Sequence, residues 1–220
     1  MDFAPLVLSL EVAAIATAIA AVVGVALGLA LTARRLPARD LLDVVFTAPM
    51  VLPPTVLGYY VLVALGRSSF VGRAFERVFG SSIVFTRTGA VVAAAVGAVP
   101  IVVKSSRAAL DGVDATLLLA ARTLGATAPR AFFTVQLPLA ARGIVAALML
   151  AFARSLGDFG VTLMVAGDIP GETQTASLAI YDAIQAHRED EALAMVVILS
   201  FAAMGVLYAV NKLTERRDVP

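Results

Sequence analysis

Long apolar runs alternate with short polar segments along the chain. Five of these runs reach the length of about 20 residues that a membrane-spanning helix needs. They predict spans at about 6–31, 44–65, 83–103, 139–165 and 192–210. We therefore expect an all-α integral membrane protein with five transmembrane helices, in a single transmembrane domain that covers residues 1–220.

The second run contains prolines that interrupt its helical pattern. Pro49, Pro53 and Pro54 each remove a backbone donor, so the helix is kinked or broken there. Broken backbone occurs at membrane depth only where protein or a water-filled cavity surrounds it. Two interpretations stay open: a bend that lines a transport path, and a packing kink without substrate contact. Candidates for the path are Pro53, Pro54 and the nearby Tyr59.

The fourth run carries two opposite charges inside an apolar segment. Arg154 and Asp158 are four residues apart, so on one helix they share a face and can pair. Each charge near the bilayer centre costs about 2.5–3.5 kcal/mol, so such residues usually face protein or a water-filled path. The pair is either a structural salt bridge or part of a gate in the outer half of a path.

The loop at about 111–138, between the third and fourth runs, carries helix punctuation. Asp114 is a good N-cap for a helix that starts with the next residue. Gly125 can end that helix in a left-handed conformation. Pro129 suits the first turn of a second short helix. The loop is therefore expected to form two short helices with a sharp bend between them.

Small residues occur around this bend at helical spacing. Ala121, Gly125 and Ala128 stand at i, i+4 and i+7, so we expect them to line one side that a partner can approach closely. Pro138 is expected to open the next apolar run.

Charge asymmetry predicts the orientation in the membrane. Three arginines, at positions 34, 35 and 39, follow the first run, whereas Asp2 is the only charged residue before it. By the positive-inside bias the N-terminus is outside, the 111–138 loop is cytoplasmic and the C-terminus is cytoplasmic. The 67–87 segment would then be external, and its four arginines would meet either acidic residues of an external partner or lipid phosphates.

Composition narrows the class further. The chain is 60% hydrophobic and 15% charged, with a mean hydropathy of +0.92, whereas soluble domains have about 25% charged residues. The absence of cysteine excludes disulfides, and a single histidine argues against a histidine metal site. A net charge of +1 does not favour nucleic acid. The apolar start does not resemble an ordinary secretory signal. We find no P-loop and no nucleophile–base set, so the chain is not expected to be an enzyme or to bind a cofactor itself.

A second feature of the 111–138 loop is a spaced motif that resembles the cytoplasmic coupling motif of ABC-importer permeases. It runs Ala120-Ala121, three residues, Gly125, nine residues, then Val135-x-Leu137-Pro138. The chain has Leu119 where the family usually has glutamate, and Val135 where isoleucine is usual. The first change removes a carboxylate, so any polar contact of that glutamate is absent or replaced here.

Two further segments carry a resemblance, the first to the molybdate-type permeases and the second to the molybdate- and sulfate-type permeases. They are PMVLPPTVLGYYVLVALGR, which starts at Pro49, and the segment Phe152–Gly160, where the family often has glutamate at the position of Asp158. The resemblance implies a type I ABC-importer permease fold in a bacterial inner membrane. It also implies a homodimer with two cytoplasmic ATPase subunits, which bind ATP and Mg, and an extracytoplasmic oxyanion-binding protein.

The cargo that the resemblance implies is molybdate, with tungstate or sulfate as alternatives. A gradient-driven carrier without an ATPase is an alternative from another class. It predicts a chain of titratable residues within the membrane, for which Glu11, Arg154 and Asp158 are few. A membrane scaffold without transport is the third class, and it gives no reason for the broken second run or the buried charges.

Overall fold

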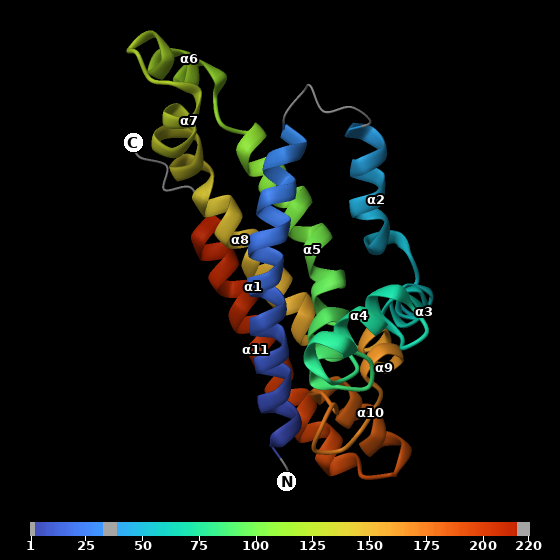
Figure 1. Cartoon of the computed structure of the whole chain (residues 1–220). Helices are drawn as coiled ribbons and strands as arrows, with labels where there is room; N and C mark the ends of the chain where they lie inside the picture. The colour runs from blue at the N-terminus through green and yellow to red at the C-terminus, as the bar shows by residue number, and fades with distance from the viewer. Residues whose placement is uncertain (1–2, 33–38, 215–220) are drawn as a thin grey trace.

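A computed structural model describes residues 3–32 and 39–214, which form helices joined by turns (Figure 1). Four helical segments are long and apolar enough to cross a membrane, and a fifth candidate span is a bent pair of helices. The four are α1 (Ala4–Thr32), α5 (Arg87–Asp111), the segment Ala128–Leu156 that ends in α8, and α11 (Glu189–Thr214). The expectation of an all-α membrane protein is confirmed.

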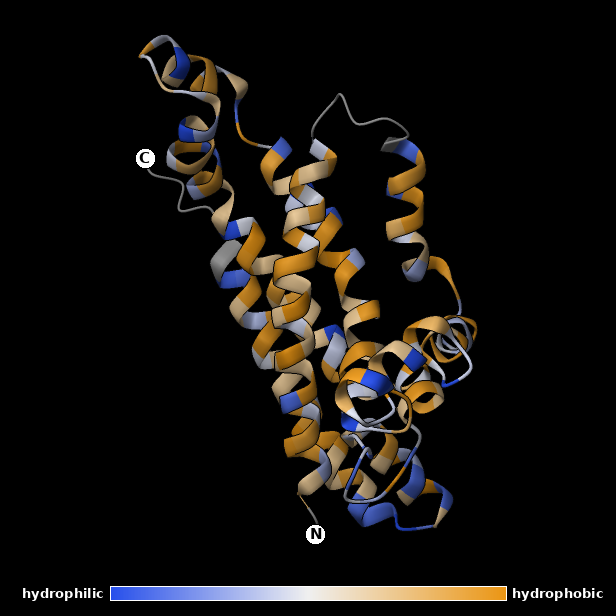
Figure 2. Ribbon diagram, viewed as in Figure 1, coloured by the Kyte–Doolittle hydropathy of each residue, from blue (hydrophilic) through white to orange (hydrophobic). Residues whose placement is uncertain are grey.

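The long helices are apolar along most of their length, and polar residues concentrate at the two ends of the bundle (Figure 2). One end carries α6 (Ala115–Thr123) and α7 (Ala128–Ala131), which project beyond the other helices (Figure 1). The opposite end carries α4 (Phe70–Phe79), α9 (Gly160–Ala166) and α10 (Ala176–Gln185). We refer to these as the hairpin end and the α10 end.

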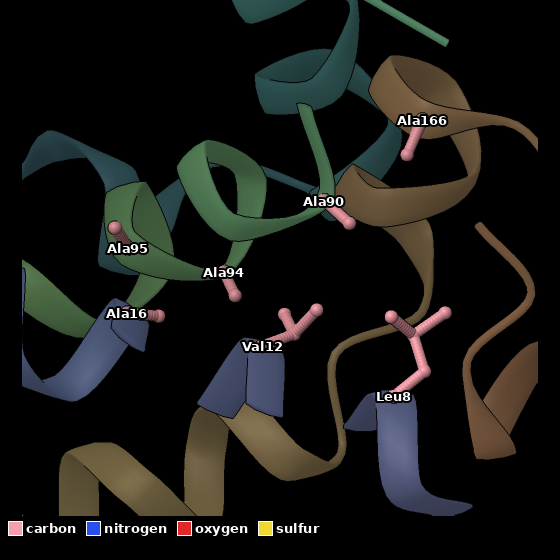
Figure 3. Close-up of a cluster of buried hydrophobic side chains, with 7 residues drawn as sticks. All are labelled: Leu8, Val12, Ala16, Ala90, Ala94, Ala95 and Ala166. Atoms are coloured by element: carbon pink, nitrogen blue, oxygen red, sulfur yellow. The ribbon is translucent and has the colours of Figure 1, made fainter. Parts of the chain in front are cut away.

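Small residues bring α1 and α5 into close contact. A Cβ atom at Gly24 would lie 2.7 Å from Cβ of Val102, and one at Gly28 would lie 3.0 Å from the carbonyl oxygen of Val103. The Gly-x-x-x-Gly pair therefore packs against α5, as such pairs do in membrane helices. Nearer the α10 end, side chains of α1 point toward alanines of α5 and α9 in a buried apolar cluster (Figure 3): Leu8, Val12, Ala16, Ala90, Ala94, Ala95 and Ala166.

The second predicted span is broken rather than kinked. It consists of α2 (Arg39–Val51) and α3 (Pro54–Leu65), whose axes differ by 116°. Pro54 occupies the first turn of α3, where its missing donor costs nothing. Pro49 lies inside α2 without ending it. The break falls at Leu52 and Pro53, so α3 runs across the bundle instead of continuing α2 (Figure 1).

The fourth predicted span is also broken, and its prediction as one helix over residues 139–165 was wrong. Helix α8 (Leu137–Leu156) ends with Gly157 at its C-cap, and the short helix α9 starts at Gly160. Two glycines three residues apart give the chain the freedom to stop one helix and start another.

The bounds of the remaining spans differ from the prediction. Helix α5 begins four residues later than the expected 83 and continues to Asp111, so Lys104 and Arg107 lie within it. Thr86 caps its start by accepting a hydrogen bond from the Gly89 amide. The segment 67–87 is not a plain loop, because it contains α4. Helix α10, between α9 and α11, has ten residues and buries Ala176, Leu178, Ala179 and Ala183.

Candidate functional site

The first candidate region is the hairpin of α6 and α7. The Asp114 carboxylate accepts a hydrogen bond from the Thr116 amide at 2.8 Å and caps α6, as predicted. This backbone hydrogen bond, with a smaller contribution from the Thr116 side chain, lowers the pKa of Asp114 below 3.8. Gly125 follows the helix with φ at +85°, which confirms the predicted left-handed bend.

We expected the second arm of the hairpin to be a separate short helix, but it is joined to the next long helix. Helix α7 passes through a π-helical turn, η1 (Phe132–Gln136), directly into α8, so residues 128–156 form one helical segment. Pro129 lies in its first turn, as predicted. Pro138 lies in the first turn of α8, directly after the π-helical turn, so its predicted place at the start of the fourth apolar run is confirmed. The second arm of the hairpin is therefore continuous with α8.

The base of the hairpin is fixed to α5. The Gln136 side-chain amide donates to the carbonyl oxygen of Leu110 at 3.2 Å. Leu110 is buried in a cluster with Ala140 and Ile144 of α8. A Cβ atom at Gly143 would lie 2.7 Å from Cβ of Ala109, so α5 and α8 touch closely here. The base of the hairpin is thus attached to two of the long helices.

The tip of the hairpin is exposed and partly apolar. Leu119 is 60% exposed and Leu124 is 88% exposed, and no residue in the hairpin before Ala131 is buried. Helix α6 ends at Thr123, so Ala121, Gly125 and Ala128 do not share one helix, and their placement on one side of the bend stays a prediction. The matched motif positions all lie on this hairpin or at the start of α8: Leu119, Ala120, Ala121, Gly125, Ala128, Val135, Leu137 and Pro138.

The second candidate region surrounds the charged pair. Arg154 Nη1 donates to Asp158 Oδ1 at 2.9 Å, so the predicted pairing is confirmed. The predicted shared helix face is wrong, because Asp158 lies after α8 has ended. Asp158 Oδ2 accepts hydrogen bonds from the Thr162 amide at 3.0 Å and the Thr162 hydroxyl at 2.7 Å. The aspartate therefore holds the start of α9 as well as the arginine.

Arg154 lines two cavities. One, of about 570 Å³, is lined by Arg154 and Asp158 together with residues of α3 and α9. The other, of about 310 Å³, is lined by Arg154 and by apolar residues of α2, α3 and α5. Pro54 lines both cavities. Tyr59 lines neither and is 57% exposed on α3, so the structure does not bring it to the charged pair.

The two helix breaks meet beside these cavities. A Cβ atom at Gly160 would lie 2.7 Å from Cβ of Pro54, and one at Gly58 would lie 2.8 Å from Cβ of Met164. Helices α3 and α9 are therefore packed along each other from their first residues. Irregular backbone from two spans is therefore gathered at one place, where Pro53 and Pro54 remain exposed in the single chain.

The α10 end is connected to the same break. The Ser177 hydroxyl at the start of α10 donates to the carbonyl oxygen of Asp158 at 2.8 Å. The rings of Phe159 and Tyr181 lie 5.3 Å apart. On the other side, the Ala176 amide donates to the buried Ser9 hydroxyl of α1 at 2.7 Å. A force applied to α10 would reach the residue that pairs with Arg154.

The arginines at this end include one with a clear structural role. Arg87 donates from Nε to the Glu172 carbonyl oxygen at 3.1 Å and from Nη2 to the Gly171 carbonyl oxygen at 3.2 Å. Arg67 lies 3.5 Å from Glu76 in an exposed pair, which contributes little to stability. Helix α4 leaves Phe70 and Phe79 largely exposed.

The sequence interpretation missed several residues that organise these regions. Asp43 of α2 pairs with Lys104 at 2.7 Å and with Arg107 at 3.1 Å, which joins the first half of the broken span to α5. In the sequence, the position of Asp43, a carboxylate just before the second apolar run, could have indicated this pairing. Thr162 and Ser177 carried no signal, because their partner is identified only by the fold.

Sequence comparison finds named relatives over most of the chain. The chain is 43% identical over 201 residues to the molybdenum transport system permease protein ModB of Escherichia coli (strain K12), covering 91% of this chain and 88% of that one. It is 32% identical over 195 residues to the sulfate transport system permease protein CysT of Salmonella typhimurium, covering 89% and 70%.

Solved structures share the fold. The MetNI methionine ABC transporter in an inward-facing conformation gives a TM-score of 0.71 at 18% identity, covering 95% of this chain and 92% of that one. A bacterial ABC transporter involved in the import of alginate gives 0.74 at 15% identity, covering 98% and 79%. At these identities the likeness establishes the fold alone.

A family model described as the binding-protein-dependent transport system inner membrane component matches residues 12–217. This description implies partners of two kinds, an ATPase and a binding protein. With the match over nearly the whole chain and the shared fold, the chain belongs to this family: it is a multi-pass inner-membrane permease subunit of an ABC importer, and it is not itself an ATPase.

Proposed function

We propose that the chain forms the membrane path of an importer for molybdate, with tungstate or sulfate as alternative cargoes. The similarity to the molybdenum permease of E. coli supports molybdate. The lower similarity to the sulfate permease of S. typhimurium makes sulfate the second candidate. All three are tetrahedral oxyanions, and Arg154 between the two cavities is a suitable cation on their way.

The working unit is a twofold homodimer. One chain leaves a face of α3 exposed at Tyr59 and Tyr60. A second copy related by a twofold axis would cover the same face of each chain and enclose a path between them. Most closed oligomers of identical chains have this symmetry.

The hairpin end faces the cytoplasm and the α10 end faces outward, so the N-terminus is outside and the C-terminus is inside. The positive-inside bias supports this orientation. An extracytoplasmic binding protein then docks on the surface that α10 and the neighbouring loops form.

The observation that carries this proposal is the covalent and packed continuity of the hairpin with the long helices. Two cytoplasmic ATPase subunits, which hold ATP and Mg, each grip one hairpin. Because residues 128–156 are one helical segment and the Gln136 side chain is hydrogen-bonded to the Leu110 carbonyl oxygen, movement of the hairpin shifts α5 and α8 together. Alternation between inward-open and outward-open arrangements then follows from ATP binding and hydrolysis in the partner.

Reconstitution tests this function. The chain is placed in proteoliposomes with the ATPase and binding protein of its own transport system, and uptake of labelled molybdate is measured with and without ATP. We expect uptake that requires ATP and the binding protein, and competition by tungstate and sulfate identifies the preferred cargo. Uptake that ignores ATP would support a gradient-driven carrier instead.

A further inference from the structure

The Arg154 guanidinium donates only part of its N–H groups to other described residues of the protein. Its Nη1 donates to Asp158 Oδ1, and among the described residues no other group receives a hydrogen bond from it. The side chain is 37% exposed in the last turn of α8, and it borders both cavities. A Cβ atom at Gly97 would lie 3.5 Å from Nη2, so α5 leaves room beside the remaining donors.

Asp158 does not depend on the arginine alone. Its side chain is 2% exposed, and its second oxygen accepts two hydrogen bonds from Thr162 at 3.0 Å and 2.7 Å. The carboxylate would keep these bonds if Arg154 turned away. The ion pair can therefore open without leaving a buried charge wholly unpartnered, which is the costly outcome when a buried pair is broken.

We propose that Arg154 is a transient oxyanion-binding residue of the path, and that the cargo replaces Asp158 as the partner of its guanidinium during passage. This inference rests on the function proposed above and names the residue that contacts the cargo. The planar guanidinium offers several donors that match two oxygens of one tetrahedral anion. The oxyanion offers acceptors only, as the carboxylate does, so it can take the same place.

The surroundings favour brief binding over tight binding. The cavity of about 310 Å³ is lined by Arg154 and otherwise by apolar residues and glycine, among them Leu52, Leu57 and Ile101. An anion there gains one cation and competes with Asp158 for it. A path needs binding that is strong enough to admit the ion and weak enough to release it.

Chemical modification tests the contact directly. In the assembled complex, phenylglyoxal modification of Arg154 is quantified by mass spectrometry with 10 mM molybdate, sulfate or nitrate present. We expect the two divalent oxyanions to slow modification of Arg154 several-fold relative to nitrate, while Arg67 at the exposed α10 end reacts equally in all three. Equal modification of Arg154 in the three salts would overturn the proposal.

Paired variants separate anion contact from a purely structural ion pair. Arg154→Met alone leaves Asp158 charged, so it is made both alone and together with Asp158→Asn, which restores charge balance and can still accept from Thr162. We expect at least a tenfold loss of molybdate uptake in both, with ATPase pull-down unchanged. Arg154→Lys should retain part of the uptake.

Recovery of uptake in the double variant would show that Arg154 serves only to neutralise Asp158, and the proposal would fall. The proposed function fails separately. If the unaltered chain transports no oxyanion with its ATPase and binding protein, the importer assignment for this cargo is wrong whatever the variants do.

Discussion

Gly160 and Pro54, residues of two different broken spans, lie in direct contact: a Cβ atom at Gly160 would be 2.7 Å from Cβ of Pro54. The contact places the start of α9 against the start of α3. Both cavities beside Arg154 are bordered by Pro54. The shape of both cavities therefore depends on this approach of two helix breaks.

Gly160→Ala is expected to separate α3 from α9. The added methyl group meets the ring of Pro54, and overpacking of this kind costs about 1–3 kcal/mol. We expect a lower melting temperature of the purified protein and reduced uptake. Gly205→Ala in α11 is the matched control, because nothing lies within 4 Å of a Cβ atom there. Equal melting temperatures for the two variants would contradict the close contact.

Gly125→Trp is expected to block docking of the ATPase while the protein still inserts into the membrane. The residue is exposed at the tip of the hairpin, with nothing within 4 Å of a Cβ atom, so the indole would project toward the partner. Gly125→Ala is the control for backbone strain, because φ at +85° disfavours any side chain, at about 1–2 kcal/mol. Pull-down of the ATPase should be lost with Trp and largely kept with Ala; retention with Trp would be a contrary result.

Substitutions at Leu119 test which contact with the ATPase replaces that of the glutamate that the family usually has. Its side chain is apolar and 60% exposed on α6, so we expect its contact with the ATPase to be apolar. Leu119→Glu should then weaken the pull-down several-fold, since a charge would be buried against an apolar surface, and Leu119→Met should not. Stronger binding of the Glu variant would indicate a basic surface on the partner.

The cap of α6 should depend on pH. The hydrogen bond from Thr116 lowers the pKa of Asp114 in the folded hairpin below its value of 3.8 in an unfolded chain. Its contribution to helix stability is therefore present above pH 3.8 and is lost as the pH falls through the lowered pKa. Hydrogen exchange of the α6 amides, corrected for intrinsic rates, should rise in that range. Asp114→Asn should remove this dependence; an unchanged pH profile would exclude the cap as its source.

Local features of this fold could be predicted from the sequence, and long-range ones could not. Asp114 and Gly125 act on neighbouring backbone, so their roles were visible in the residue order. The break after Leu156 was signalled by Gly157 and Gly160, but the apolar run around them concealed it. The π-helical turn before Pro138 gave no signal.

Contacts between distant segments explain the rest. Pro54 meets Gly160, and Ser177 meets Asp158, only because the helices pack as they do. The pairing of Arg154 with Asp158 was predicted from a spacing of four residues on a helix, yet it forms across the end of that helix. The correct pair thus had a different structural basis from the expected one.

The central claim is that the hairpin is the handle that a cytoplasmic ATPase grips, and the absence of native cysteines allows one direct measurement. Leu124→Cys at the hairpin and Tyr181→Cys on α10 are each cross-linked in the assembled complex with a thiol-to-amine reagent. We predict that Leu124→Cys links to the ATPase subunit and does not react with an impermeant thiol label added outside intact cells. Tyr181→Cys should react with that label and should not link to the ATPase. Labelling of Leu124→Cys from outside, or its failure to link to the ATPase, would contradict the claim.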